Sequence, residues 1–266
     1  MEKNSIEGIV YHFKKSEINN PKGVIVFVHG FATTSNYHLN FANQLKDYDY
    51  YAIELPGHGY SKLDSKKDLS PYNLALKVIR WIELLKLEDF YLIGHSMGGG
   101  IVNIVASKIP EKIIKVVAVT PMNSSFSFKL RNIYKFVPKT LKGTLRMEKI
   151  ILKEPEKFFP NKLNDEGLIK ELNYQKDNRS NFKYLRKNMA SLRNLKILKK
   201  CEENNFLKTL VLLGKYDQII DWKSANKRFS KLKNYQLYVF QNSAHLPFWE
   251  EPELYKEKVL EFIERE

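Results

Sequence analysis

The sequence contains a single cysteine, Cys201, among its 266 residues. One thiol cannot form an internal disulfide and gives no metal site. Long apolar runs are also missing: the longest, such as Val24–Val28 and Val116–Val119, have the length of strands and are too short to span a bilayer. The first residues include no apolar stretch of signal-peptide length. We therefore expect a soluble, cytoplasmic protein.

Acidic residues are scarce in one part of the chain. The net charge is +14, and residues 121–200 hold 20 Lys and Arg against 7 Asp and Glu, a net charge of +13. The remainder is close to neutral, with 24 basic and 23 acidic residues. A general preference for lysine would raise its frequency everywhere, and it does not explain the missing acids in one segment. The charge therefore marks residues 121–200 as a distinct unit.

Outside that unit, apolar runs of strand length alternate with helical patterns. The length and the 43% hydrophobic content are sufficient for one large domain with an insertion. The predicted strands are Ile9–Phe13, Lys22–His29, Tyr50–Leu55, Phe90–Ile93, Lys115–Thr120, Thr209–Leu213 and Gln236–Phe240. The predicted helices are Tyr37–Leu45, a helix capped by Ser70, Met97–Ile109, Trp222–Leu232 and Pro252–Ile263. This alternation predicts an α/β protein with a mostly parallel central sheet flanked by helices.

Residues 121–200 contain no comparable strand pattern. They carry basic, amphipathic stretches instead, and the clearest apolar series falls on one helical face: Phe182, Leu185, Met189, Leu192, Leu195 and Leu198. We predict a core formed by residues 1–120 and 201–266, interrupted by a helical, basic insertion at residues 121–200.

A glycine-rich turn follows the predicted strand Phe90–Ile93. In Gly94-His95-Ser96-Met97-Gly98, the flanking glycines remove the clashes of an abrupt strand-to-helix turn, and the serine hydroxyl projects above the sheet edge. The free N–H groups of the following helix favour negative charge at the same place. So short a pattern also occurs by chance around a bystander serine, and other segments must decide.

A serine hydroxyl is a poor nucleophile unless a base and an orienting group accompany it. Among the six histidines, His245 follows a predicted strand, and so does Asp217. Chemistry in an open α/β sheet gathers beyond the carboxyl ends of the strands, so both are candidates to meet Ser96. Asp221 is an alternative acid, although its place before Trp222 suits a helix N-cap. We expect structural roles for His29, His58 and His95.

Several segments together resemble the α/β-hydrolase family, and they occur in that family's order. They are His29-Gly30-Phe31, Leu55-Pro56-Gly57-His58-Gly59-Tyr60-Ser61, Gly94-His95-Ser96-Met97-Gly98-Gly99, Gly214-Lys215-Tyr216-Asp217 and Ser243-Ala244-His245. The resemblance covers nearly the whole chain apart from residues 121–200, which take the position of the family's cap or lid.

The resemblance implies a role for each matching residue. Ser96 would be the nucleophile, His245 the general base and then acid, and Asp217 the group that orients His245. The backbone N–H groups of Phe31 and Met97 would form the oxyanion hole. This chemistry needs neither a metal nor an organic cofactor.

The activity expected from the resemblance is that of a serine carboxylic-ester hydrolase working through an acyl-enzyme. Its substrate would be a small acyl ester, a monoacylglycerol or a lysophospholipid. Two alternatives within the family are a proline-type aminopeptidase or amidase, and a hydrolase of carbon–carbon bonds in diketone acids. The non-enzymatic alternative is a basic module that binds membranes or nucleic acid, but no nucleic-acid recognition motif is present.

The basic insertion is also rich in aromatic residues: Phe126, Phe128, Tyr134, Phe136, Phe158, Phe159, Tyr174, Phe182 and Tyr184. One interpretation is that it meets lipid-like or anionic substrates at a membrane surface, with basic faces for headgroups and apolar faces for acyl chains. The other is a solvated basic surface whose aromatic side chains pack the insertion onto the core.

Overall fold

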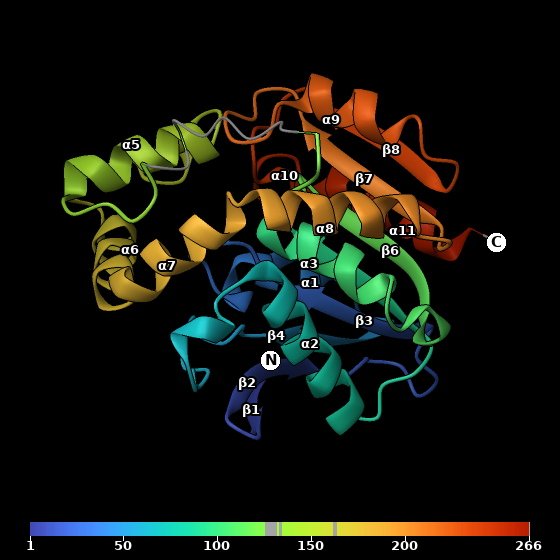
Figure 1. Cartoon of the computed structure of the whole chain (residues 1–266). Coiled ribbons are helices and arrows are strands. Elements are labelled where there is room, and N and C mark those ends of the chain that lie inside the picture. Colours follow the sequence, from blue (N-terminus) through green and yellow to red (C-terminus); the bar gives the residue numbers. More distant parts are fainter. Residues whose placement is uncertain (126–131, 133–134, 162–163, 266) are drawn as a thin grey trace.

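A computed structural model describes residues 1–125, 132, 135–161 and 164–265 (Figure 1). Its centre is an eight-stranded sheet in the order β1-β2-β4-β3-β5-β6-β7-β8. The strands are β1 (Glu2–Ile6), β2 (Ile9–Lys14), β3 (Gly23–Val28), β4 (Tyr48–Ile53), β5 (Phe90–His95), β6 (Ile113–Val119), β7 (Thr209–Gly214) and β8 (Tyr235–Phe240). Strands β3 to β8 pair with one another in parallel. At one edge, β2 pairs antiparallel with β4, and β1 pairs antiparallel with β2. The predicted mostly parallel sheet is confirmed.

The core also contains helices, which lie between these strands or follow the last of them. They are α1 (Leu39–Gln44), α2 (Pro71–Leu84), α3 (Met97–Ala106), α9 (Trp222–Phe229), α10 (Pro247–Glu250) and α11 (Pro252–Glu264). Ser70 caps α2 as predicted, because its hydroxyl oxygen accepts a hydrogen bond from the N–H of Asn73 at 3.2 Å. Helices α1 and α11 pack together through the rings of Phe41 and Tyr255, whose centres lie 4.9 Å apart.

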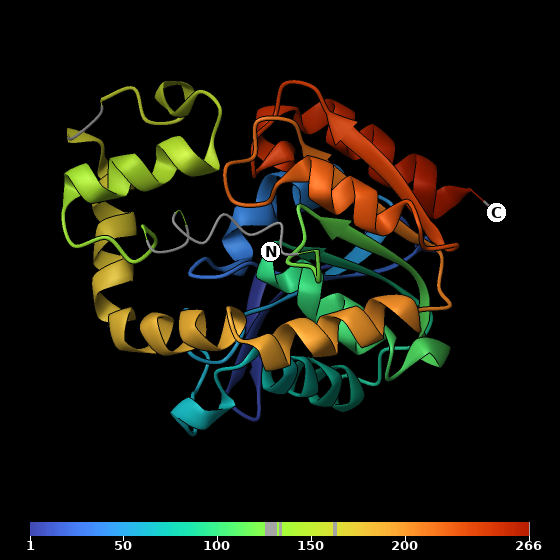
Figure 2. The same ribbon diagram turned by 45° about the horizontal axis from the view of Figure 1, so that its top comes forward.

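The described residues of the segment 121–200, for which the sequence predicted a helical character, contain further helices. These are α5 (Leu141–Ile151), α6 (Glu166–Asp177), α7 (Arg179–Met189) and α8 (Leu192–Glu203), the last of which ends beyond residue 200. Helices α5, α6 and α7 lie to one side of the sheet, and α8 lies along α3 (Figures 1 and 2). Three aromatic residues of the basic insertion, Phe126, Phe128 and Tyr134, lie outside the described residues.

The prediction that residues 182–198 present a single apolar helical face is wrong in one respect. The chain forms two helices there, because the Ser191 hydroxyl accepts a hydrogen bond from the N–H of Asn194 at 3.2 Å and starts α8 anew. The break resets the helical phase. Phe182 and Leu198 are fully buried, whereas Leu192 is 69% exposed.

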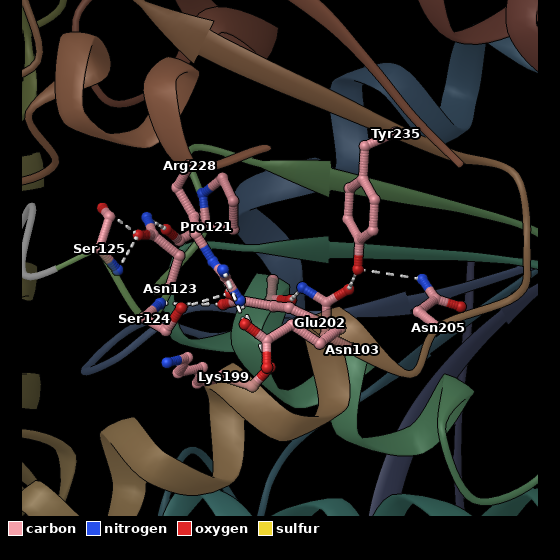
Figure 3. A network of polar contacts seen from close by, with 12 residues as sticks. Asn103, Pro121, Asn123, Ser124, Ser125, Lys199, Glu202, Asn205, Arg228 and Tyr235 are labelled. Atoms are coloured by element: carbon pink, nitrogen blue, oxygen red, sulfur yellow. Dashed lines mark hydrogen bonds and ion pairs between the residues drawn. The ribbon is translucent and has the colours of Figure 1, made fainter. Parts of the chain in front are cut away.

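Both ends of the segment 121–200 are fastened to the core by one buried network (Figure 3). Glu202 of α8 accepts hydrogen bonds from the N–H of Ser124 at 2.9 Å and from its hydroxyl at 2.5 Å. The same carboxylate forms an ion pair of 2.9 Å with Arg228 of α9. A neighbouring bond joins the Tyr235 hydroxyl to Asn103 of α3 at 3.3 Å. The chain therefore leaves and re-enters the core at adjacent, mutually bonded positions.

None of the helices in the described residues is both long enough and apolar enough to cross a membrane.

Candidate active site

Ser96 occupies a strained turn between β5 and α3. Its backbone angles are φ 53° and ψ −115°, a region that side-chain-bearing residues rarely adopt. Bonds to neighbouring segments hold it there: its N–H donates to the carbonyl oxygen of Val119 at 2.9 Å, and its own carbonyl accepts from the N–H of Met122 at 2.8 Å. The hydroxyl is thereby fixed at the carboxyl end of the central strands.

The glycines around Ser96 are required by close backbone contacts. A Cβ atom on Gly94 would lie 2.4 Å from the carbonyl oxygen of Gly98, and one on Gly98 would lie 2.2 Å from the carbonyl oxygen of Val28. Neither distance is possible for a real side chain. The spacing of the motif therefore has the mechanical origin expected from the sequence.

Ser96, His245 and Asp217 form a continuous chain of hydrogen bonds. The Ser96 hydroxyl lies 2.9 Å from Nε2 of His245, and Nδ1 of His245 lies 2.7 Å from Oδ2 of Asp217. A carboxylate accepts a hydrogen bond from Nδ1–H, so Nε2 carries a lone pair that faces the serine hydroxyl. The three side chains come from loops after β5, β7 and β8, and all three residues are buried.

The second oxygen of Asp217 is held by the backbone. Oδ1 accepts hydrogen bonds from the N–H groups of Ile219 at 2.7 Å and Ile220 at 2.9 Å, which fix the carboxylate toward His245. Asp221 has a different role. Its carboxylate caps α9 through the N–H of Ser224 at 3.0 Å, as the sequence predicted.

His95 holds the backbone of His245 through a hydrogen bond. Its Nε2–H donates to the carbonyl oxygen of His245 at 3.0 Å, and the Thr120 hydroxyl donates to the same oxygen at 3.1 Å. Burial, followed by the nearby His245, lowers the pKa of His95 well below its usual value, so the ring is neutral. The sequence predicted only packing for His95. Its place beside Ser96 was the available signal for a closer relation to the site.

His29 and His58 stabilise the loops on the other side of Ser96. Nε2 of His29 accepts a hydrogen bond from the N–H of Leu55 at 3.0 Å, and Nε2 of His58 accepts one from the N–H of Ala32 at 3.3 Å. Burial lowers the pKa of His29 to about 4 and that of His58 well below its usual value. Both rings are therefore neutral acceptors, in agreement with the structural roles predicted for them.

The loop after β3 brings a backbone donor to Ser96. A Cβ atom on Gly30 would lie 3.2 Å from Cβ of Ser96, so the chain at Gly30 and Phe31 runs directly past the serine. Met97 is the first residue of α3, where N–H groups lack helical acceptors. Within the described part of the chain, the N–H groups of Phe31 and Met97 donate no hydrogen bond. Both are free to bind an oxygen atom.

A small, mostly apolar pocket opens onto Ser96. Its lining consists of Phe31, Thr33, Tyr37, His95, Ser96, Phe136, Ile151, Met189, Ile219, His245 and Leu246. Phe136, Ile151 and Met189 come from the segment 121–200, which therefore supplies part of the wall. These lining residues, and Tyr37 from the core, are contacts that the sequence did not predict.

The described residues contain no group of three or more His, Cys, Asp and Glu side chains arranged to hold a metal ion.

Known proteins resemble this chain in sequence and in fold. The family profile described as alpha/beta hydrolase fold matches residues 23–151. A Mycoplasma genitalium protein named as esterase/lipase 3 is 30% identical over 237 residues, which are 85% of this chain and 82% of that protein. Monoacylglycerol lipase ABHD6 of Homo sapiens is 23% identical over 91% of this chain and 75% of its own length. The crystal structure of a protein described as a lipase from Acinetobacter baumannii superimposes with a TM-score of 0.85 at 20% identity, covering 98% of this chain and 90% of that one.

Proposed function

The chain belongs to the α/β-hydrolase family and is a serine hydrolase of the esterase/lipase type, and from this premise we propose that Ser96, His245 and Asp217 are its catalytic triad. The hydrogen-bonded chain from Ser96 through His245 to Asp217 is the observation that supports these roles. The free N–H groups of Phe31 and Met97 form the oxyanion hole of the proposed reaction.

The proposed reaction follows from this geometry. His245 Nε2 takes the hydroxyl proton as Ser96 Oγ attacks the ester carbonyl, and Asp217 stabilises the imidazolium that results. The N–H groups of Phe31 and Met97 donate to the oxyanion of the tetrahedral intermediate. His245 then gives its proton to the departing alcohol, which leaves an acyl group on Ser96. Water, deprotonated by His245, attacks the acyl carbon. The bond from that carbon to Ser96 Oγ then breaks, His245 returns the proton to Oγ, and the carboxylic acid is released.

The pocket lining favours an ester with an apolar acyl group. None of the described residues that line it is Lys, Arg, Asp or Glu, so this part of the wall offers no partner for the amino group of an aminopeptidase substrate or the carboxylate of a diketone acid. Aromatic and aliphatic walls suit an acyl chain. The proposed substrates are therefore small acyl esters, monoacylglycerols or lysophospholipids, and the similarity to a monoacylglycerol lipase supports this choice.

In this proposal residues 121–200 are a cap over a core of residues 1–120 and 201–266. The wall contributed by Phe136, Ile151 and Met189 supports it. The outer surface of the cap carries exposed basic side chains, including Lys142, Arg146, Lys149, Lys183 and Lys187. We assign to this surface a peripheral contact with anionic membranes, which would bring lipid-like esters to the pocket.

A substrate panel tests the proposed activity. It combines p-nitrophenyl esters of increasing chain length, a monoacylglycerol, a lysophospholipid and aminoacyl-naphthylamides. We expect hydrolysis of the esters and no release of naphthylamine. Turnover of the amides with no turnover of any ester would contradict the proposal.

A further inference from the structure

Glu250, the last residue of α10, lies between the loop that carries His245 and the end of α5. Its Oε2 atom accepts a hydrogen bond of 2.7 Å from the N–H of Ala244. Its Oε1 atom accepts one of 2.6 Å from the N–H of Lys153, two residues beyond α5. One carboxylate therefore joins the residue before His245 to the segment that follows Ile151.

A parallel contact runs beside this bridge. The N–H of His245 itself donates to the carbonyl oxygen of Ile151 at 2.8 Å. Ile151 also lines the pocket in front of Ser96. The backbone of His245 is thus bonded to a pocket wall, and Glu250 holds the two chain segments together on either side of that bond.

The charged groups around Glu250 do not neutralise it. Asp217 faces it from the loop after β7, and Glu251 follows it in the chain and binds the Asn242 N–H and the Ser243 hydroxyl. The amine of Lys153 turns away, toward the side-chain oxygen of Asn242 at 3.3 Å. His245 directs its ring nitrogens to Ser96 and Asp217.

Burial, with a smaller effect from the Asp217 charge, raises the pKa of Glu250 to about 7, although its backbone hydrogen bonds act in the opposite direction. The N–H groups of Lys153 and Ala244 each need an acceptor, one at each oxygen, and the N–H of Leu246 also donates to this carboxyl group. Only the carboxylate accepts at both oxygens. Protonation converts one oxygen into a donor that faces an N–H group, so the bond from Lys153 or the bond from Ala244 is lost. The bridge is complete above the pKa of Glu250 and incomplete below it.

We propose that Glu250 is a positioning residue for His245, bridging the backbone of the histidine loop to the end of α5 and holding the imidazole in line with Ser96. This inference rests on the proposed role of His245 as general base. It makes the reaction sensitive to the ionisation of a side chain that touches neither substrate nor reacting atoms.

The test compares the pH dependence of kcat in the unaltered protein and in Glu250→Gln. Glutamine keeps the size of the side chain but offers one acceptor, so it imitates protonated Glu250. At pH 8 we expect kcat to fall about ten- to a hundredfold, with KM little changed, because small displacements of a reacting group cost rates of this order. In the unaltered protein the acid limb of the pH profile contains two ionisations, one of which is that of Glu250. In Glu250→Gln it contains one.

The control is Glu253→Gln, an equally conservative change at an exposed residue whose carboxylate contacts Gln44 instead of the histidine loop. It should keep both ionisations and the original kcat. An acid limb in Glu250→Gln identical to that of the unaltered protein overturns the inference, whatever the loss of rate.

If Glu250→Gln does not fold, the unaltered protein still decides, because an acid limb with a single ionisation overturns the inference. Failure of the inference about Glu250 can be distinguished from failure of the proposed function. Loss of activity in Ser96→Ala supports the triad independently of any effect at Glu250.

Discussion

Gly214 at the end of β7 lies against the carbonyl group of Ala244, the residue before His245. A Cβ atom on Gly214 would be 1.7 Å from that oxygen. The strand that leads to Asp217 and the loop that carries His245 therefore touch through their backbones, with no space for any side chain. The distance between the acid and the imidazole depends on this contact.

Replacement of Gly214 by alanine should displace the histidine loop. We expect Gly214→Ala to lose about 1–3 kcal/mol of unfolding free energy, as overpacked sites do, and to lose more than tenfold in kcat because His245 moves with Ala244. Chemical denaturation and ester hydrolysis measure the two effects. The control is Gly143→Ala in α5, where the nearest atom to a new Cβ is 3.1 Å away and belongs to the Pro138 side chain. Wild-type activity in Gly214→Ala would show that the contact does not set the triad geometry.

Ser96→Ala should abolish ester turnover and leave the fold intact. Loss of the nucleophile costs on the order of 10⁶ in kcat in comparable serine hydrolases. Hydrolysis of a p-nitrophenyl ester measures the activity, and thermal unfolding checks the fold. The control is Ser107→Ala at the far end of α3, whose hydroxyl donates to the carbonyl oxygen of Ile104. If Ser96→Ala retained wild-type turnover, the proposed mechanism would be wrong.

Substitutions of the two neighbouring aspartates, Asp217 and Asp221, should have different effects. Asp217→Asn keeps the shape of the side chain but favours the wrong tautomer of His245, and we expect kcat to fall by about 10⁴. Asp221→Ala removes the cap of α9 and should cost about 0.5–2 kcal/mol of stability without a comparable loss of kcat. Steady-state kinetics and denaturation of both variants provide the comparison. The reverse pattern would transfer the orienting role to Asp221.

Most of the sheet and the three central site residues were predictable because they depend on local sequence. Buried strands appear as apolar runs, and Ser96, Asp217 and His245 each follow such a run. Strand β1 was not predicted, because Glu2–Ile6 is polar and gains its conformation from pairing with β2. The contacts of Glu250 were missed for a related reason. Glu250 is close to His245 in sequence, but the Lys153 N–H that completes its role is 97 residues away.

Stability should decrease below neutral pH because buried histidines must gain protons on unfolding. The pKa of His29 is about 4 in the folded chain and about 6.5 when exposed. The unfolded chain therefore binds more protons between these values, and the stabilising contribution is present above pH 6.5 and lost as the pH falls toward 4. For His29 this amounts to about 3 kcal/mol. Urea denaturation across pH 4–7 measures it. In His29→Gln the decline should be shallower, and an unchanged slope would assign the effect to other groups.

Charge reversal on the cap should weaken attraction to anionic membranes. Lys183 and Lys187 are exposed on α7, and each lysine near an anionic surface contributes about 1 kcal/mol. We expect Lys183→Glu with Lys187→Glu to reduce co-sedimentation with phosphatidylglycerol-containing vesicles at least tenfold at low salt. Binding by the unaltered protein should also fall as salt is added, because screening shortens the range of the attraction.

The matched control is Lys231→Glu with Lys233→Glu, two exposed positions that follow α9 in the core. It changes the net charge by the same amount, so equal losses in both double variants would show that only overall charge matters. Vesicles of neutral lipid complete the comparison. The contrary outcome is that the unaltered protein binds neither kind of vesicle at any salt concentration. In that case the basic outer surface of the cap would be a solvated surface, and the aromatic side chains of the cap would serve only to pack it onto the core. Ester hydrolysis by Ser96 would be unaffected, because the triad hydrogen bonds involve no cap side chain.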